Sequence, residues 1–175
     1  MTPELQTIAA PLSDVLRRAG YTTAGLAEFL GEDSWRALRR GEPGAVIFAL
    51  GQAPQTDLAV LIRLFLLHEP VAAQRFETIV GSSLYLELIQ AEVISLSSAS
   101  GVDEVRAGID LQPHVITGTE QVVFSDRDAS MLYDHVPSSD HVLGLALPAC
   151  RCLMPPLPVL LGRCWIWAPV LGCRL

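Results

Sequence analysis

The sequence predicts an α+β fold that is mainly α-helical, with a small β-hairpin and an irregular apolar tail. Apolar residues recur every three or four positions through much of residues 4–91, as in helices that bury one face. Apolar and polar residues alternate over 105–111, as in a strand, and Val93 to Leu96 are strand-like as well. All nineteen acidic residues lie at or before Asp140, whereas all four cysteines lie within residues 148–175. This change in composition predicts that the tail is not a continuation of the preceding fold.

Residues 1–54 are expected to form a helical N-terminal segment. Glycine follows most of its periodic apolar stretches, and glycine commonly ends helices. The predicted helices are residues 4–19, a helix capped by Thr23, a helix capped by Asp33 or Ser34, and residues 45–50.

Residues 55–118 are expected to form a second unit. Its most apolar helix, Leu58 to Leu67, should be the core of the domain, because it has few polar positions and must be covered on most sides. Pro70 suits the first position of a helix over 71–80, and Ser82 or Ser83 should cap a helix over 84–91. Strands over 93–96 and 105–111 follow, with a loop over 97–101 between them. Three short helices followed by a two-stranded hairpin are the winged-helix pattern.

The charge of the chain disfavours nucleic acid as a partner. Up to Pro148 there are nine arginines against nineteen acidic residues, and phosphate backbones are bound mainly by cationic side chains. The helix that would read DNA offers Glu87, Gln90 and Glu92, with no basic residue between Arg75 and Arg106. A winged-helix regulator of DNA is therefore disfavoured, and this helix is expected to pack or to contact protein.

The cytoplasm is the expected compartment, because the N-terminus has neither the basic nor the apolar region of a secretory signal. No membrane span is expected in the tail, since Arg163 and several prolines interrupt its apolar run. No metal site is expected either. The spacing of Cys150, Cys152, Cys164 and Cys173 does not match that of zinc-binding cysteine pairs.

Residues 119–147 are interpreted as a linker with a short strand, Gln121 to Phe124. Acidic residues and histidines lie close together near its end: Asp134, His135, Asp140 and His141. They could form a metal cluster or an acid–base pair. Proximity in the sequence of a loop is weak evidence, so capping and solvated turn residues are the favoured interpretation.

The codons of the tail constrain a second reading frame. In the shifted frame, each codon consists of the last base of one translated codon and the first two bases of the next. Because Trp has the single codon TGG, most of this frame can be deduced across Cys164-Trp165-Ile166-Trp167-Ala168. It gives Leu, then Asp, then Leu or Met, then Gly, and the following codons permit Thr-Gly-x-Gly. The absence of Lys and Asn from the chain fits a GC-rich gene. The shifted frame therefore permits Leu-Asp-Leu-Gly-Thr-Gly-x-Gly.

This hidden motif, and the stretches that precede it, resemble a known family. The stretches are Leu61-Ile62-Arg63-Leu64-Phe65-Leu66-Leu67, Glu69-Pro70-Val71, Glu104-Val105-Arg106-Ala107 with Asp110-Leu111, Phe124-Ser125-Asp126, and Asp140-His141-Val142-Leu143-Gly144. In this order they resemble the N-terminal leader of bacterial class I S-adenosylmethionine-dependent methyltransferases related to the release-factor glutamine methyltransferases. The resemblance covers about Thr2 to Gly144.

The resemblance implies that Asp140, His141 and Gly144 lie next to a cofactor domain or a substrate. It also implies a frameshift between Leu145 and Cys150, where this sequence departs from the family. S-adenosylmethionine is the cofactor expected of a full-length member, but no cofactor and no catalytic residue are assigned to this chain. Its partner would be a protein substrate.

Two hypotheses follow. The chain is a truncated, catalytically incompetent methyltransferase leader with a poorly ordered tail over 148–175, or it is a free-standing protein-interaction module. In the second case the apolar tail docks on a partner or on another copy of the chain, because exposed apolar runs associate.

Overall fold

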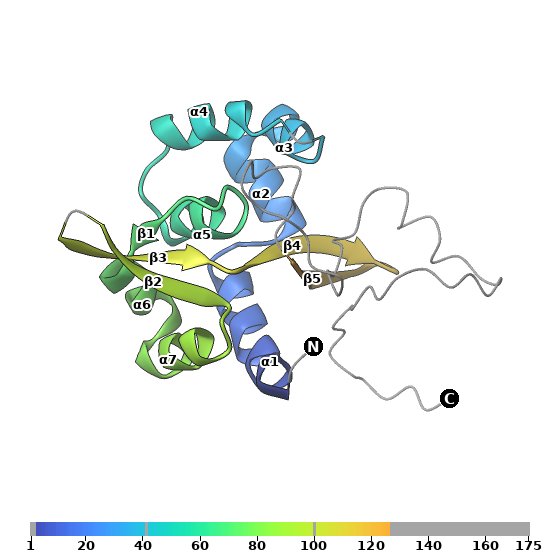
Figure 1. The fold of residues 1–175 in the computed structure, drawn as a ribbon. Coiled ribbons are helices and arrows are strands. Elements are labelled where there is room, and N and C mark those ends of the chain that lie inside the picture. Colours follow the sequence, from blue (N-terminus) through green and yellow to red (C-terminus); the bar gives the residue numbers. More distant parts are fainter. Residues whose placement is uncertain (1–2, 41, 100, 127–175) are drawn as a thin grey trace, which may run out of the picture.

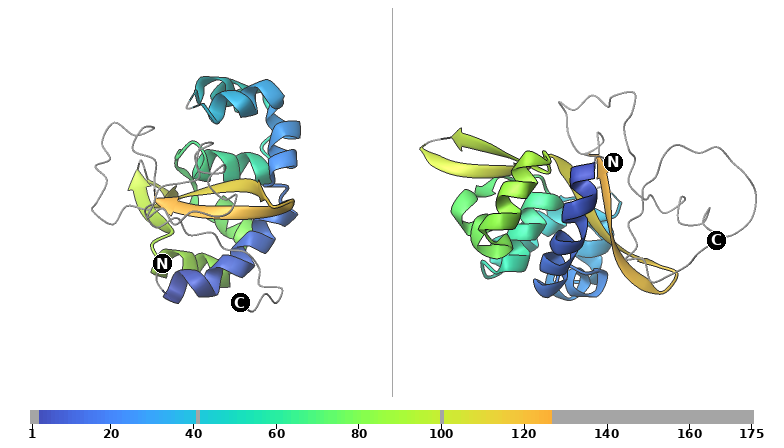
Figure 2. Two further views of the ribbon diagram at one scale, coloured as in Figure 1. Left: turned by 90° about the vertical axis from the view of Figure 1, so that its right-hand side faces the viewer. Right: turned by 90° about the horizontal axis from the view of Figure 1, so that it is seen from below.

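The computed structural model describes residues 3–40, 42–99 and 101–126, which form a mainly helical α+β fold as predicted (Figure 1). The predicted tail, and with it Asp140, His141 and Gly144, lies outside the described residues. The β2–β3 and β4–β5 hairpins project from opposite sides of the helical body (Figures 1 and 2). No helix among the described residues is long and apolar enough to cross a membrane.

The N-terminal part consists of four helices, as predicted. They are α1 (Pro3–Arg18), α2 (Thr23–Leu30), α3 (Glu32–Leu38) and α4 (Gly44–Gln52). Two expected caps were wrong. Thr22, not Thr23, caps α2, because its hydroxyl accepts the N–H of Gly25 at 3.0 Å. Gly31 precedes α3 in place of a capping Asp33 or Ser34, since its φ of 81° lets the chain turn directly from one helix into the next.

The next six elements have the winged-helix order that the sequence predicts. They are α5 (Asp57–Phe65), β1 (Val71–Ala72), α6 (Ala73–Val80), α7 (Ser82–Gln90), β2 (Ile94–Ala99) and β3 (Val102–Ala107). The three strands form an antiparallel sheet in the order β1-β3-β2.

Three details of this unit differ from the prediction. Val71 and Ala72 were expected in a helix, but they pair with Val105 and Glu104, because β3 offers them backbone partners that local sequence does not reveal. Strand β2 runs through residues that were expected to form a loop. Gly81, with φ 84°, precedes α7 where a serine cap was expected.

A second sheet follows, formed by β4 (Ile109–Ile116) and β5 (Thr119–Asp126). The single strand predicted over 105–111 is in fact divided at Gly108, whose N–H donates to the carbonyl of Val93 at 2.8 Å. A Cβ at Gly108 would lie 2.4 Å from the carbonyl oxygen of Glu92, so only glycine fits this corner. Thr117 and Gly118, with φ of 49° and 80°, form the two-residue turn of the hairpin. The predicted boundary between residues 118 and 119 falls in this turn.

Helix α5 lies at the centre of the core. Leu61, Ile62, Leu64 and Phe65 on successive sides of the helix are each fully buried, which agrees with its predicted role. The ring of Phe65 meets that of Phe76 on α6 edge to face, with 6.1 Å between centroids. The same core includes Leu12 and Leu16 on α1 and Leu26 on α2, so it joins the winged-helix unit to the N-terminal helices.

Candidate functional site

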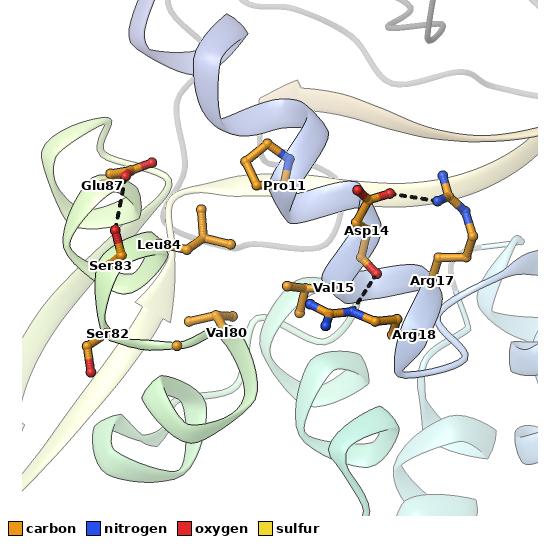
Figure 3. Close-up of a pocket in the computed structure, with 11 residues that line it drawn as sticks. Pro11, Asp14, Val15, Arg17, Arg18, Val80, Ser82, Ser83, Leu84 and Glu87 are labelled. Carbon is orange, nitrogen blue, oxygen red and sulfur yellow. Dashed lines mark hydrogen bonds and ion pairs between the residues drawn. The ribbon is translucent and has the colours of Figure 1, made fainter.

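An open cleft of about 900 Å³ lies between α1 and the turn that joins α6 to α7 (Figure 3). Its apolar part comes from both sides, with Val15 on α1 facing Val80 and Leu84 (Figure 3). Its polar residues are Asp14, Arg17 and Arg18 on α1, and Ser82, Ser83 and Glu87 on α7. The cleft therefore presents an apolar centre between two polar rims, which suits a peptide segment better than a small charged metabolite.

Most polar groups of the cleft bond within their own helices, and Ser82 Oγ on α7 donates to Glu77 Oε1 on α6. Arg17 Nη1 donates to Asp14 Oδ1 at 2.8 Å, and Arg18 Nε donates to the Asp14 carbonyl at 3.4 Å. On the other rim, Ser83 Oγ donates to Glu87 Oε1 at 3.4 Å. The Arg17 and Asp14 side chains are 58% and 66% exposed, so water screens their charges. The lining residues include no histidine or cysteine, and the Ser83–Glu87 contact is long and exposed to water, so the cleft is better suited to binding than to nucleophilic catalysis.

A buried polar cluster lies where α5, β4 and the end of α1 meet. His68 Nε2 and Asp110 Oδ1 are hydrogen-bonded, and the two side chains are only 5% and 7% exposed. Tyr21 Oη donates to the carbonyl of Leu111 at 2.6 Å. Burial, and then the charge of Asp110, raise the pKa of the Tyr21 hydroxyl. His68 also has a φ of 53°, in the left-handed region that favours glycine.

The sequence did not predict this cluster. In the alternating pattern of residues 105–111, Asp110 belongs to the outward, polar set, but the structure buries it. Its partner His68 lies far back in the chain, and nothing local connects the two. The one available signal was the interruption of a strongly apolar helix by a histidine. Because both side chains are enclosed, we assign the cluster a structural role.

A hydrogen bond also connects the β4–β5 hairpin to α2. The backbone N–H of Thr23 donates to Glu120 Oε1 on β5. His114 on β4 is 9% exposed, and its Nε2 has no hydrogen-bond partner among the described residues. Burial, followed by the charge of Arg39, lowers the pKa of His114, against a smaller raising effect of Glu120. The hairpin is thus held to the helices by hydrogen bonds and by buried side chains.

The site residues predicted from the sequence, Asp140, His141 and Gly144, lie outside the described residues, as do Asp134 and His135. The structure therefore does not bring them together or separate them. Within residues 3–40, 42–99 and 101–126, no group of three or more His, Cys, Asp or Glu side chains could hold a metal ion.

One part of the chain matches a known protein family. A family model described as a domain of unknown function, DUF7059, matches residues 18–108. The match runs from the last residue of α1 to the Gly108 corner, and it includes the whole winged-helix unit. Neither the curated proteins nor the solved structures contain a match to the chain.

Proposed function

The chain belongs to the DUF7059 family, whose model matches more than half of its length, and on the separate ground of its codons we propose that it is the leader of a methyltransferase. In this proposal the described domain holds a protein substrate. Methyl transfer belongs to a cofactor domain that the gene encodes in another reading frame downstream of Leu145.

The codon constraint in the tail carries the proposal. Two tryptophans flank Ile166, and their single codon fixes Asp and Gly in the shifted frame under Trp165 to Ala168. The resulting Leu-Asp-Leu-Gly resembles the first motif of class I methyltransferases, and the glycines that the following codons permit would let the backbone approach a cofactor, as in dinucleotide-binding folds. The open cleft supports the holding role, because an apolar centre between two polar rims suits a peptide segment.

The described residues do not fit S-adenosylmethionine. Such a cofactor is bound where a strand leads through a glycine-rich turn into a helix. Among the described residues β1 is the strand that leads directly into a helix, and the junction between Ala72 and Ala73 has no glycine. We therefore assign no step of methyl transfer to residues 3–126. Their contribution would be to hold the acceptor, since proximity and orientation make up much of the catalysis of such reactions.

The test is to restore the frame. Inserting one base between the codons of Leu145 and Cys150 makes the ribosome read the shifted frame and whatever the gene encodes after it. Calorimetry should then detect micromolar binding of S-adenosylmethionine to the restored protein and none to the chain as translated. Replacing the aspartate of the restored Leu-Asp-Leu-Gly by alanine is the matched control and should abolish binding. Binding by the original chain, or a stop codon soon after the insertion, would refute the proposal.

A second candidate, a free-standing protein-interaction module, is favoured by the surface of α4. This helix has no charged residue, and Phe48 and Ile47 on it are 73% and 49% exposed. The candidates differ in the tail. A leader with an out-of-frame tail should keep its melting temperature when the chain is cut after Gly144, whereas a module that uses its tail should lose stability or change its oligomeric state.

A further inference from the structure

The recognition helix of the winged-helix unit and the neighbouring hairpin carry exposed apolar side chains. Leu86 on α7 is 59% exposed and Leu96 on β2 is 55% exposed. On α7 the buried side is formed by Leu84 and Leu88, so Leu86 belongs to the opposite, solvent-facing side. Two large leucines exposed on adjacent elements mark a surface that a partner can cover.

Tyr85 connects this surface to α6 and β3. Its ring packs against Phe76 of α6, with 6.3 Å between centroids. Burial raises the pKa of its hydroxyl, and the charges of Glu77 on α6 and Asp103 on β3 raise it further. Helix α6 contacts both β3 and α7, and α7 contacts β2, so Glu77 and Asp103 come from elements packed around Tyr85. We name Glu77, Tyr85, Leu86, Leu96 and Asp103 together the α7–hairpin surface.

The two carboxylates have no cation beside them in the part of the chain that the structure describes. Glu77 Oε1 accepts from Ser82 Oγ, and Asp103 Oδ1 accepts from Ser98 Oγ, each at 2.7 Å. Neither takes part in an ion pair among the described residues.

The two arginines nearest in sequence are directed elsewhere. Arg75 pairs with Asp57 at the start of α5. Arg106 lies three positions after Asp103 on β3, where it is opposite Ser95 of β2. Because side chains alternate between the two faces of a strand, Arg106 is on the face opposite to Asp103. The α7–hairpin surface is thus apolar and negatively charged.

We infer that the α7–hairpin surface docks a basic, leucine-bearing segment of a protein partner. An arginine or lysine of that segment sits beside Tyr85 between Glu77 and Asp103, where cation–π and charge-assisted contacts reinforce each other. Apolar side chains of the segment cover Leu86 and Leu96. The same charges repel duplex DNA, because its phosphates would face carboxylates. The inference rests on the proposed function only in assigning the segment to the methyl-accepting protein.

The test uses the full chain and a short fluorescein-labelled peptide that alternates leucine and arginine, with binding followed by fluorescence anisotropy. The wild-type chain should bind this peptide, and should not bind matched peptides with glutamate in place of arginine or serine in place of leucine. Asp103→Arg and Glu77→Arg should each weaken binding at least about tenfold, because an attractive contact becomes a repulsive one. Added salt should weaken wild-type binding as well.

Two matched variants exclude general effects of charge and hydrophobicity. Asp33→Arg makes the same charge change at a fully exposed side chain on α3, and it should leave binding within about threefold. Leu86→Ser should weaken binding about fivefold or more, whereas Phe48→Ser removes an exposed apolar side chain elsewhere and should not. Circular dichroism verifies that each variant is folded.

The inference would be overturned if the peptide failed to bind, if Asp33→Arg weakened binding as much as Asp103→Arg, or if duplex DNA bound in place of the peptide. The experiments distinguish failure of the methyltransferase proposal from failure of the docking surface. If the frame-restored protein did not bind S-adenosylmethionine while Asp103→Arg still abolished peptide binding, the methyltransferase proposal would fall and the docking surface would stand.

Discussion

The buried pair of His68 and Asp110 allows a sharp test of what holds the β4–β5 hairpin to the body. His68→Asn removes the partner of a carboxylate that is 7% exposed, and asparagine tolerates the left-handed backbone of this position. A buried charge left without its partner costs about 3–5 kcal/mol of folding free energy. The converse change, Asp110→Asn, leaves no buried carboxylate and keeps a polar group beside His68, and should cost about 1–3 kcal/mol.

The two changes should therefore be unequal, and the double variant should lose less than the sum of the single variants. Urea unfolding of the full chain, followed by far-ultraviolet circular dichroism at pH 7, measures all three differences. Asp14→Asn, which breaks the exposed pair of Asp14 with Arg17, is the matched control and should cost less than about 1 kcal/mol. If His68→Asn cost no more than this control, or if the single effects simply added, the pair would not hold the two parts together.

Three further experiments test other parts of the structure. Phe65→Ala should lower the free energy of unfolding by about 3–5 kcal/mol in the same urea assay, because Phe65 is fully buried, and a loss below about 1 kcal/mol would contradict the assigned core. Gly108→Ala should lower the melting temperature, because its Cβ would collide with the carbonyl of Glu92, whereas Gly51→Ala in α4, which has open space around it, should raise stability by about 0.5–1 kcal/mol. Because the folded pKa of His114 lies below its unfolded value, the unfolded chain takes up the proton first, and stability should fall as the pH drops from about 6.5. His114→Gln should flatten that part of the pH curve, and an identical curve for wild type and variant would contradict this account.

Local patterns were enough to predict the helices. Nearly every residue of α5 is apolar and buried, so its composition alone indicated a covered helix. The winged-helix order could be predicted because each of its elements has a local signal. The β4–β5 hairpin was predicted in part, since Gln121 to Phe124 were expected in a strand.

Long-range pairing accounts for what was missed. Val71 and Ala72 have helical neighbours, and they form a strand because β3 pairs with them. The alternation of apolar and polar residues predicts that Asp110 faces outward. It is buried instead, because its carboxylate bonds to His68. The cleft was missed because its two rims, at Asp14 and Glu87, come from helices far apart in the chain. Of the α7–hairpin surface, the sequence predicted only that α7 has no basic residue.

The register of the second hairpin fixes where the described chain stops in space. Asp126 pairs with Ile109, the residue directly after the Gly108 corner. Paired strands lie about 5 Å apart, so the chain goes out along β4 and comes back to its own starting point. Asp126 is therefore held next to the winged-helix unit and not at the distant hairpin tip, so a group bound to its side chain would have a high effective concentration near that unit.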